Sequence, residues 1–157
     1  MIVAREIRME GVVQGVGFRP FVFRLAQEYG IKGWVLNSSE GVTIWAEAGD
    51  EVVDAFYKAI LDHPPKLAMI VKHSIRPREL QSFDHFFIKH SEKSAKRDVI
   101  ISPDVSTCED CYQEIMDPSD HRYHYPFTNC TNCGPRFTII MDVPYDREKT
   151  TMRDFPM

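Results

Sequence analysis

The chain has 157 residues, of which 43% are hydrophobic, and its length fits one domain, or one small domain plus a module too small to fold alone. Residues 1–90 hold 11 basic and 11 acidic residues, whereas residues 91–157 hold 8 and 12 and supply the net charge of −4. Neither part has the basic excess typical of nucleic-acid binding. No stretch is apolar enough for a signal peptide or a membrane span. We therefore expect a cytoplasmic protein with no nucleic-acid or membrane partner.

Residues 1–90 are predicted to form an α+β sandwich of the βαββαβ type. Loose alternation of apolar residues indicates strands, and apolar residues at helical spacing indicate two helices. The predicted order is strand, helix, strand, strand, helix, strand, strand, over residues 3–13, 20–30, 33–37, 42–46, 51–62, 67–76 and 83–89. This order places the helices on one face of a mostly antiparallel sheet with an extra edge strand.

The rest of the chain is different in character. Residues 91–99 are polar, and we interpret them as a linker. Residues 100–157 are rich in Cys, Pro, Asp, His and Tyr and show no long amphipathic element. This segment therefore needs a cross-link, such as a disulfide or a bound metal, to hold its fold. We expect two separate modules, in which loss of a bound metal would affect only the second.

A glycine-rich segment connects the first strand to the first helix, residues 13–20, with the sequence Val-Gln-Gly-Val-Gly-Phe-Arg-Pro. Its glycines allow positive φ, so that backbone N–H groups turn inward beside a helix N-terminus and form an anion-binding nest. Arg19 adds a planar fork that matches phosphate. Pro20 should hold Arg19 extended at the rim of the loop. The spacing is not that of a Rossmann or Walker loop, and an ordinary turn with a surface arginine fits it equally well.

All four cysteines lie in two C-x2-C pairs that are separated by 18 residues. This spacing is typical of a tetrahedral zinc site, in which four thiolates make a closed, structural centre. The alternatives are free reduced cysteines or a redox pair, and His121 or His124 could substitute for a ligand. We predict one structural zinc ion with the ligands Cys108, Cys111, Cys130 and Cys133.

Two segments of the first module resemble the signatures of acylphosphatases. Residues 13–19 read Val-Gln-Gly-Val-Gly-Phe-Arg, and residues 33–41 contain Gly-Trp-Val-Leu-Asn followed by Glu-Gly. Both lie at the expected places in the βαββαβ order. The resemblance implies that Asn37 positions the attacking water, although Asn37 also fits a simple turn-forming role. It implies that the phosphate of an acyl phosphate binds to a loop made of Gln14, Gly15, Val16, Gly17, Phe18 and Arg19, with Arg19 also catalytic.

The sequence around the cysteines, residues 106–111 and 125–139, resembles the zinc-finger region of the carbamoyltransferases that mature nickel–iron hydrogenases. Proteins of that family place an acylphosphatase-like domain first. The resemblance implies that this domain hydrolyses carbamoyl phosphate, or another acyl phosphate, to its acid and phosphate. Later domains would adenylate the carbamate with ATP and pass it to a cysteine of a hydrogenase-maturation partner protein.

The chain stops where that family has the first cysteine of its second finger, so we expect an amino-terminal fragment truncated before that finger. It would lack the nucleotide-binding and transferase domains as well. Two other functions remain open. One is a stand-alone acylphosphatase, and the other is a zinc-ribbon module for protein interaction.

Overall fold

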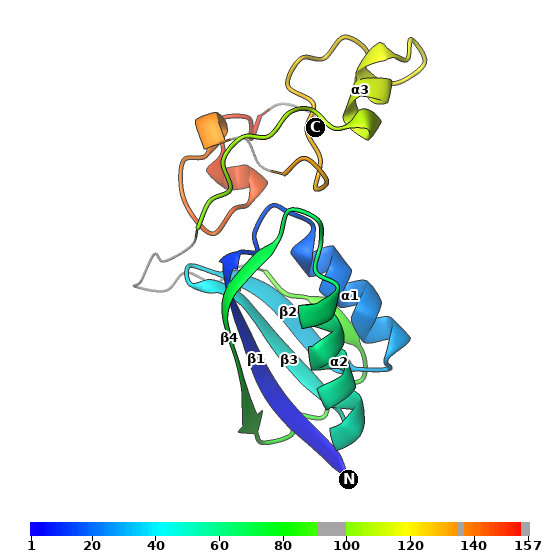
Figure 1. Ribbon diagram of the computed structural model, residues 1–157, viewed down its shortest axis with the longest axis vertical. Coiled ribbons are helices and arrows are strands. Elements are labelled where there is room, and N and C mark those ends of the chain that lie inside the picture. Colours follow the sequence, from blue (N-terminus) through cyan, green and yellow to red (C-terminus); the bar gives the residue numbers. More distant parts are fainter. Residues whose placement is uncertain (91–99, 135–136, 155–157) are drawn as a thin grey trace.

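The structure is a computed structural model that describes residues 1–90, 100–134 and 137–154. Its first ninety residues form an α+β sandwich, and the cysteine-bearing segment lies against one end of that sandwich (Figure 1). This arrangement confirms the predicted fold class, with a small finger module after the sheet. The predicted linker, residues 91–99, lies outside the described residues.

The element order of the first ninety residues is the predicted one. The sheet has the strand order β4-β1-β3-β2-β5, in which β5 pairs parallel with β2 and every other pair is antiparallel. The elements are β1 (Ile2–Val12), α1 (Phe18–Glu28), β2 (Lys32–Ser38), β3 (Gly41–Gly49), α2 (Asp50–Asp62), β4 (Met69–Arg78) and β5 (Phe86–Ile88).

Strand register brings two loops to the same end of the sheet. In β1, Met9 pairs with Val42 of β3, close to the turn that joins β2 to β3, and Ser38 pairs with Gly41 across that turn. The glycine loop that leaves β1 therefore lies beside the β2–β3 turn. This end of the sheet faces the finger segment (Figure 1).

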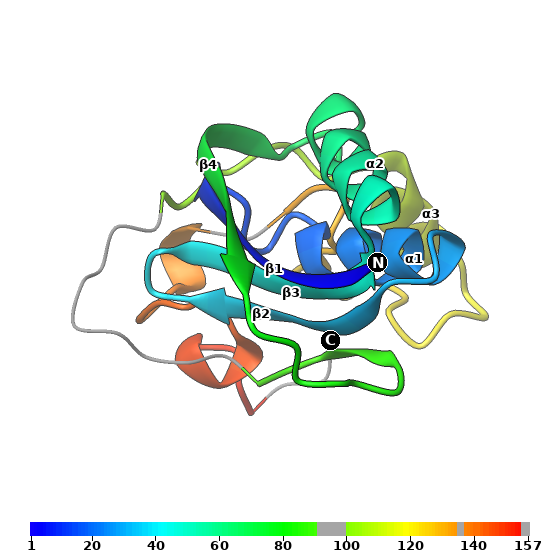
Figure 2. The same ribbon diagram turned by 90° about the horizontal axis from the view of Figure 1, so that it is seen from below.

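Both helices cover one face of the sheet, and the core lies between the two layers (Figure 2). Helix α2 turns Val53, Phe56 and Ile60 inward at helical spacing, and each is fully buried. Helix α1 does the same with Phe18, whose ring packs beside that of Phe21. Burying a large apolar side chain contributes roughly 1.5–3 kcal/mol, so this core stabilises the sandwich without the finger.

A buried carboxylate binds the segment that leads into β5, which begins at Phe86 and is shorter than the predicted strand 83–89. Glu47 on β3 is 3% exposed, and its carboxylate accepts hydrogen bonds from Gln81 N at 2.7 Å, Phe83 N at 3.1 Å and Trp45 Nε1 at 2.9 Å. Of these groups only Phe83 N belongs to the predicted strand 83–89, and it binds the Glu47 side chain instead of a neighbouring strand. Burial alone would raise the pKa of Glu47, but the donated hydrogen bonds outweigh it and hold that pKa below its ordinary value.

The second region has little regular structure. It contains α3 (Glu109–Met116) and two single turns of 3₁₀ helix, η1 (Phe137–Ile139) and η2 (Arg147–Lys149). Its buried hydrophobic residues within the described ranges are Cys111, Cys133 and Met152. Among the described residues, no helix has both the length and the apolar character needed to cross a membrane.

Candidate active site and metal centre

The glycine loop adopts the backbone conformation that its sequence predicts. Gly15 has a φ of 70° and Gly17 a φ of 77°, both in the left-handed region that side-chain-bearing residues rarely adopt. Gly17 is also the N-cap residue of α1, so the loop runs directly into the positive end of a helix. A loop of this kind suits an anion.

The prediction that Pro20 holds Arg19 in an extended conformation is wrong. Helix α1 begins at Phe18, so both Arg19 and Pro20 lie in its first turn. The first helical hydrogen bond runs from Phe21 N to Gly17 O at 3.0 Å. The missing N–H of Pro20 therefore costs no bond within the helix. Proline is favoured in the first turn of a helix, and here this outweighs the weaker preference that proline imposes on its predecessor.

Arg19 and Asn37, the two predicted catalytic residues, lie in contact. Asn37 lies within β2, before the turn that the alternative role would need, and it is 1% exposed. With its amide oxygen turned toward the arginine, the orientation that pairs donors with acceptors, Asn37 accepts from Arg19 Nε at 3.1 Å and Nη2 at 3.2 Å. The fork of the guanidinium group is therefore held by a buried side chain of the sheet.

Gln14 is a buried hub of the loop. Its Nε2 donates to Ser38 O at 2.6 Å and Gly41 O at 2.9 Å, which ties the loop to both ends of the β2–β3 turn. Its Oε1 accepts a hydrogen bond from the backbone N–H of Tyr145 at 2.9 Å. One side chain thus joins the glycine loop, the sheet and the finger segment.

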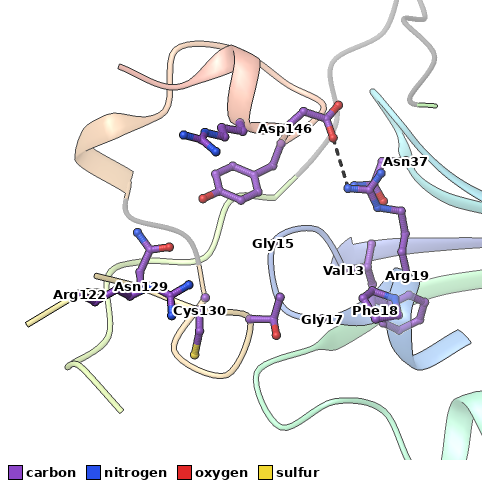
Figure 3. A pocket seen from close by; sticks show the side chains of 15 residues that line it. Val13, Gly15, Gly17, Phe18, Arg19, Asn37, Arg122, Asn129, Cys130 and Asp146 are labelled. Carbon is purple, nitrogen blue, oxygen red and sulfur yellow. Dashed lines mark hydrogen bonds and ion pairs between the residues drawn. The ribbon is translucent and has the colours of Figure 1, made fainter. Parts of the chain in front are cut away.

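A cavity of about 500 Å³ opens between the loop and the finger segment (Figure 3). The sandwich contributes Gly15, Gly17, Arg19 and Asn37, and the finger segment contributes more than half of the lining residues. Asp146 reaches across the cavity, with its Oδ1 3.2 Å from Arg19 Nη2 (Figure 3). Sequence reasoning missed the contribution of the finger segment because these residues follow the loop by more than one hundred positions and have no recognisable spacing. They include Arg122, Asn129, Thr131, Tyr145, Asp146 and Arg147.

The four cysteines converge on one point. Their sulfur atoms all lie within 4.8 Å of one another, with Sγ–Sγ distances of 3.4 Å for Cys108 and Cys130 and 3.9 Å for both Cys111 with Cys133 and Cys130 with Cys133. Zinc–sulfur bonds of about 2.3 Å in a tetrahedron place the sulfur atoms about 3.8 Å apart. The cluster therefore fits one zinc ion. Among the described residues, neither His121 nor His124 belongs to it.

The surroundings of the sulfur atoms also favour a bound cation. Burial raises the pKa of the Cys111 thiol, and its neighbouring thiols raise it further. A cation removes this penalty, because thiolates around it are paired with positive charge. Asn132 N lies 3.3 Å from Cys130 Sγ, as in a metal knuckle, and Cys130 N lies 3.4 Å from Cys133 Sγ. Cys108 caps α3, so the positive end of that helix also faces the cluster.

Known proteins match both regions of the chain. The acylphosphatase family matches residues 5–88, and the HypF finger matches residues 107–140. The acylphosphatase of Archaeoglobus fulgidus is 38% identical over 90 residues, which are 57% of this chain and 100% of that protein. The crystal structure of the acylphosphatase from Bacillus subtilis gives a TM-score of 0.52 at 33% identity, over 57% of this chain and 99% of that one. The chain belongs to the acylphosphatase family.

With its finger included, the chain is similar to the amino-terminal region of much larger proteins. The carbamoyltransferase HypF of Synechocystis sp. is 46% identical over 155 residues, which are 99% of this chain and 20% of that protein. A crystal structure of full-length HypF in the phosphate- and nucleotide-bound form gives a TM-score of 0.91 at 50% identity, over 100% of this chain and 21% of that one. The chain spans about a fifth of the length of the curated HypF relatives that it matches.

Proposed function

We propose that the cavity beside the glycine loop hydrolyses an acyl phosphate, with carbamoyl phosphate as the natural substrate. The observation that carries this proposal is a single cavity that unites a left-handed glycine loop, the Arg19 guanidinium group and the buried amide of Asn37. Each group has a part in such a reaction. The products are a carboxylate, which is carbamate for this substrate, and inorganic phosphate.

In the proposed reaction, the loop N–H groups and Arg19 bind the phosphate oxygens and stabilise the charge that develops on them. A water oxygen bonds to phosphorus while the bond from phosphorus to the acyl oxygen breaks. The carboxylate leaves with the electron pair, and a proton of the water passes to a phosphate oxygen. Because Arg19 occupies the Asn37 oxygen, the NH₂ group of Asn37 is the part that positions the water oxygen.

A site with so few functional groups suits this substrate. A carboxylate is a good leaving group, so the reaction needs charge stabilisation and orientation more than a strong general base. The positive charge and the fixed donors supply both. The metal centre has four thiol groups for one ion and no place for a water ligand, so zinc there holds structure and takes no part in the reaction.

We further propose that the carbamate serves a carbamoyl transfer in nickel–iron hydrogenase maturation, with a hydrogenase-maturation partner protein as the final recipient. The support is the 46% identity with a carbamoyltransferase HypF along nearly the whole chain, together with the HypF finger. We place the reaction in the cytoplasm, where thiols stay reduced and available to a metal.

Hydrolysis of carbamoyl phosphate and of benzoyl phosphate, measured in parallel in ¹⁸O-labelled water, tests the proposed reaction. We expect release of phosphate from both compounds, with the label in phosphate because water attacks phosphorus. Label in the benzoate formed from benzoyl phosphate would contradict the mechanism. Absence of hydrolysis with both compounds would contradict the function itself.

The Arg19→Ala variant tests the assignment of the site. Loss of the guanidinium group should lower kcat by about 10²–10³ because it removes charge stabilisation in the transition state. The matched control is Arg24→Ala, which removes an exposed arginine of the same helix and should leave the rate unchanged. Asn37→Ala should lower kcat more than it weakens inhibition by phosphate. An Arg19→Ala variant with activity close to that of the unmodified chain would refute the loop assignment.

A further inference from the structure

We propose that Asp146 of the finger segment is a positioning residue for Arg19, so that the acyl-phosphate site is completed by the finger module. The sandwich alone then supplies the loop and the arginine, while the finger fixes the direction in which that arginine points. This inference rests on the proposed function, because it gives a residue outside the sandwich a role in the same reaction.

The first support is the way the donors of Arg19 are used. A guanidinium group has five N–H donors in one plane. Nε and Nη2 point to the oxygen of Asn37, and Nη2 also donates to Asp146 Oδ1 at 3.2 Å. Asn37 and Asp146 thus hold the group from two different parts of the molecule. Within the described part of the chain, both hydrogens of Nη1 remain for a ligand.

The ion pair is sheltered from solvent. The Arg19 side chain is 25% exposed and that of Asp146 is 29% exposed. Exposed ion pairs add little to stability because solvent and salt screen their charges. Partial burial of both partners weakens this screening. A side chain held in this way has already lost its rotational freedom before the substrate binds, which is the advantage of a preorganised site.

The second support is the anchoring of Asp146 itself. Its neighbour Tyr145 donates a backbone hydrogen bond to Gln14, which is 4% exposed and bound to the β2–β3 turn. Two consecutive residues of the finger segment therefore contact two side chains of the glycine loop signature. We call residues 145–146 the strap.

The second cysteine pair brings another part of the finger to the same loop. A Cβ atom placed on Gly17 would lie 3.3 Å from Thr131 Cβ, and one placed on Gly134 would lie 3.7 Å from Gly15 O. The loop is thus packed against the residues beside the metal centre as well as against the strap. The finger therefore contacts the glycine loop at two places, beside the metal centre and at the strap.

The charge of the cavity favours positioning over simple blockage. A carboxylate next to a phosphate site would repel the substrate if it faced Arg19 alone. The cavity is also lined by Arg122 and Arg147, so its lining residues include three arginines and one carboxylate, and Arg122 is itself paired with Glu114 at 3.0 Å. A cavity with this balance stays attractive to a phosphate anion. Asp146 can therefore orient Arg19 without cancelling the charge of the site.

The Asp146→Ala variant of the full chain tests the inference, with the unmodified chain, Asp146→Glu and Asp154→Ala beside it. Asp154 is an exposed aspartate of the same segment and serves as the control. For Asp146→Ala we expect kcat/KM for benzoyl phosphate to fall about tenfold, in line with the cost of a misplaced catalytic group, and inhibition by inorganic phosphate to weaken. Asp146→Glu should recover much of the loss, and Asp154→Ala should behave as the unmodified chain.

A second readout is hydrogen exchange at Arg19 Nη2, the atom that donates to Asp146, followed by NMR in the absence of any substrate. We expect slower exchange than at the Nη atoms of Arg24, and faster exchange at Arg19 Nη2 once Asp146 is replaced. If Asp146→Ala lowers the melting temperature, Asp146→Asn, which keeps the shape of the side chain, replaces it in both measurements. The exchange measurement does not need a working enzyme, so it distinguishes a failure of this inference from a failure of the proposed function.

Two outcomes would overturn the inference. A rise in kcat/KM with tighter phosphate inhibition would show that the Asp146 carboxylate competes with the substrate for Arg19. Unchanged kinetics with unchanged exchange at Arg19 would show that Asn37 alone holds the guanidinium group. If the unmodified chain hydrolyses benzoyl phosphate and Arg19→Ala does not, either outcome leaves the proposed function intact.

Discussion

The sandwich and the finger keep their shapes by different means. The sandwich surrounds sixteen buried apolar side chains with two layers of regular structure. The finger buries three hydrophobic residues within its described part, and two of them, Cys111 and Cys133, belong to the cysteine cluster that fits a zinc ion. The first region is thus organised by the hydrophobic effect and the second by metal coordination. A chain of this length can add a module to a small domain without building a second core.

The two regions nevertheless share one site. The expectation of two separate modules did not anticipate the hydrogen bond from Tyr145 to Gln14, the ion pair of Asp146 with Arg19, or the packing of Thr131 near Gly17. These contacts place the metal-dependent region directly on the loop of the metal-independent one. We therefore expect the metal to affect the phosphate site, which revises the prediction that its loss would affect only the finger.

Removal of zinc should have the largest effect, and it tests whether the metal organises the finger and the hydrophobic core organises the sandwich. Structural zinc contributes about 10–16 kcal/mol of apparent binding free energy in zinc-finger peptides, so a strong chelator or Cys111→Ser should unfold residues 100–154. Two-dimensional NMR should then show loss of dispersed signals from the finger and shifted signals from the glycine loop, while the strands keep their signals. Mass spectrometry of the native protein should count one zinc per chain.

Two results of the zinc-removal experiment would contradict this prediction. Collapse of the strand signals together with those of the finger would mean that the sandwich depends on the metal. Loop signals that stay in place would mean that the finger does not touch the loop in solution. The Ser102→Ala variant is the control. Ser102 is buried but lies outside the cluster, so zinc should stay bound in this variant.

The Phe56→Ala variant tests the other side of the comparison. Phe56 is fully buried between α2 and the sheet, and its truncation should lower the free energy of unfolding by about 3–5 kcal/mol. Zinc affinity should not change, because the cluster has no share in this core. Val52→Ala removes a partly exposed residue of the same helix and should cost far less. Urea unfolding measures the free energy of unfolding of both variants. A loss of zinc in Phe56→Ala would show that the zinc cluster depends on the core of the sandwich.

The smallest expected effect concerns Glu47, the buried carboxylate of the sandwich. Its pKa is lower in the folded chain than in the unfolded one, so its contribution is present above the unfolded value of about 4.5 and is lost as pH falls through the folded value. Glu47→Gln should lower the free energy of unfolding at pH 7 by about 1–3 kcal/mol, because charged acceptors bind these N–H groups more strongly.

Urea unfolding from pH 7 to pH 3 checks the Glu47 prediction. The difference between the unmodified chain and Glu47→Gln should shrink below pH 4.5, because the unmodified carboxylate becomes neutral as well. Glu79→Gln replaces an exposed glutamate near the same segment and should show no such trend. A difference that stays constant with pH would show that the effect comes from shape and not from charge.

Local patterns predicted the sandwich well because its elements depend on nearby residues. Helical spacing gave α2, and the Gly15–Gly17 sequence indicated the left-handed turns that the loop adopts. The two cysteine pairs indicated a metal site because their spacing alone encodes it. The conformation of Arg19 was mispredicted, because α1 begins at Phe18 and includes Arg19 and Pro20 in its first turn.

Asp146 was beyond the reach of local patterns. Its role depends on a contact with Arg19 across 127 positions, and nothing near it in the sequence distinguishes it from other acidic residues of an acidic segment. The hydrogen bonds of Glu47 are equally non-local, because its side chain binds N–H groups that lie 34 and 36 positions further along the chain. Long-range polar contacts of this kind need a folded structure to be seen.

The distance along the chain between Arg19 and Asp146 also sets the time that passes between their translation. A ribosome that adds about 5–20 residues per second makes Asp146 about 6–25 s after Arg19. The last strand of the sheet ends at Ile88, so the whole sandwich leaves the exit tunnel before the strap does. During that interval the nascent protein presents its arginine to the cell without its acidic partner. The site therefore matures in two stages, and the second begins only when the strap emerges from the exit tunnel.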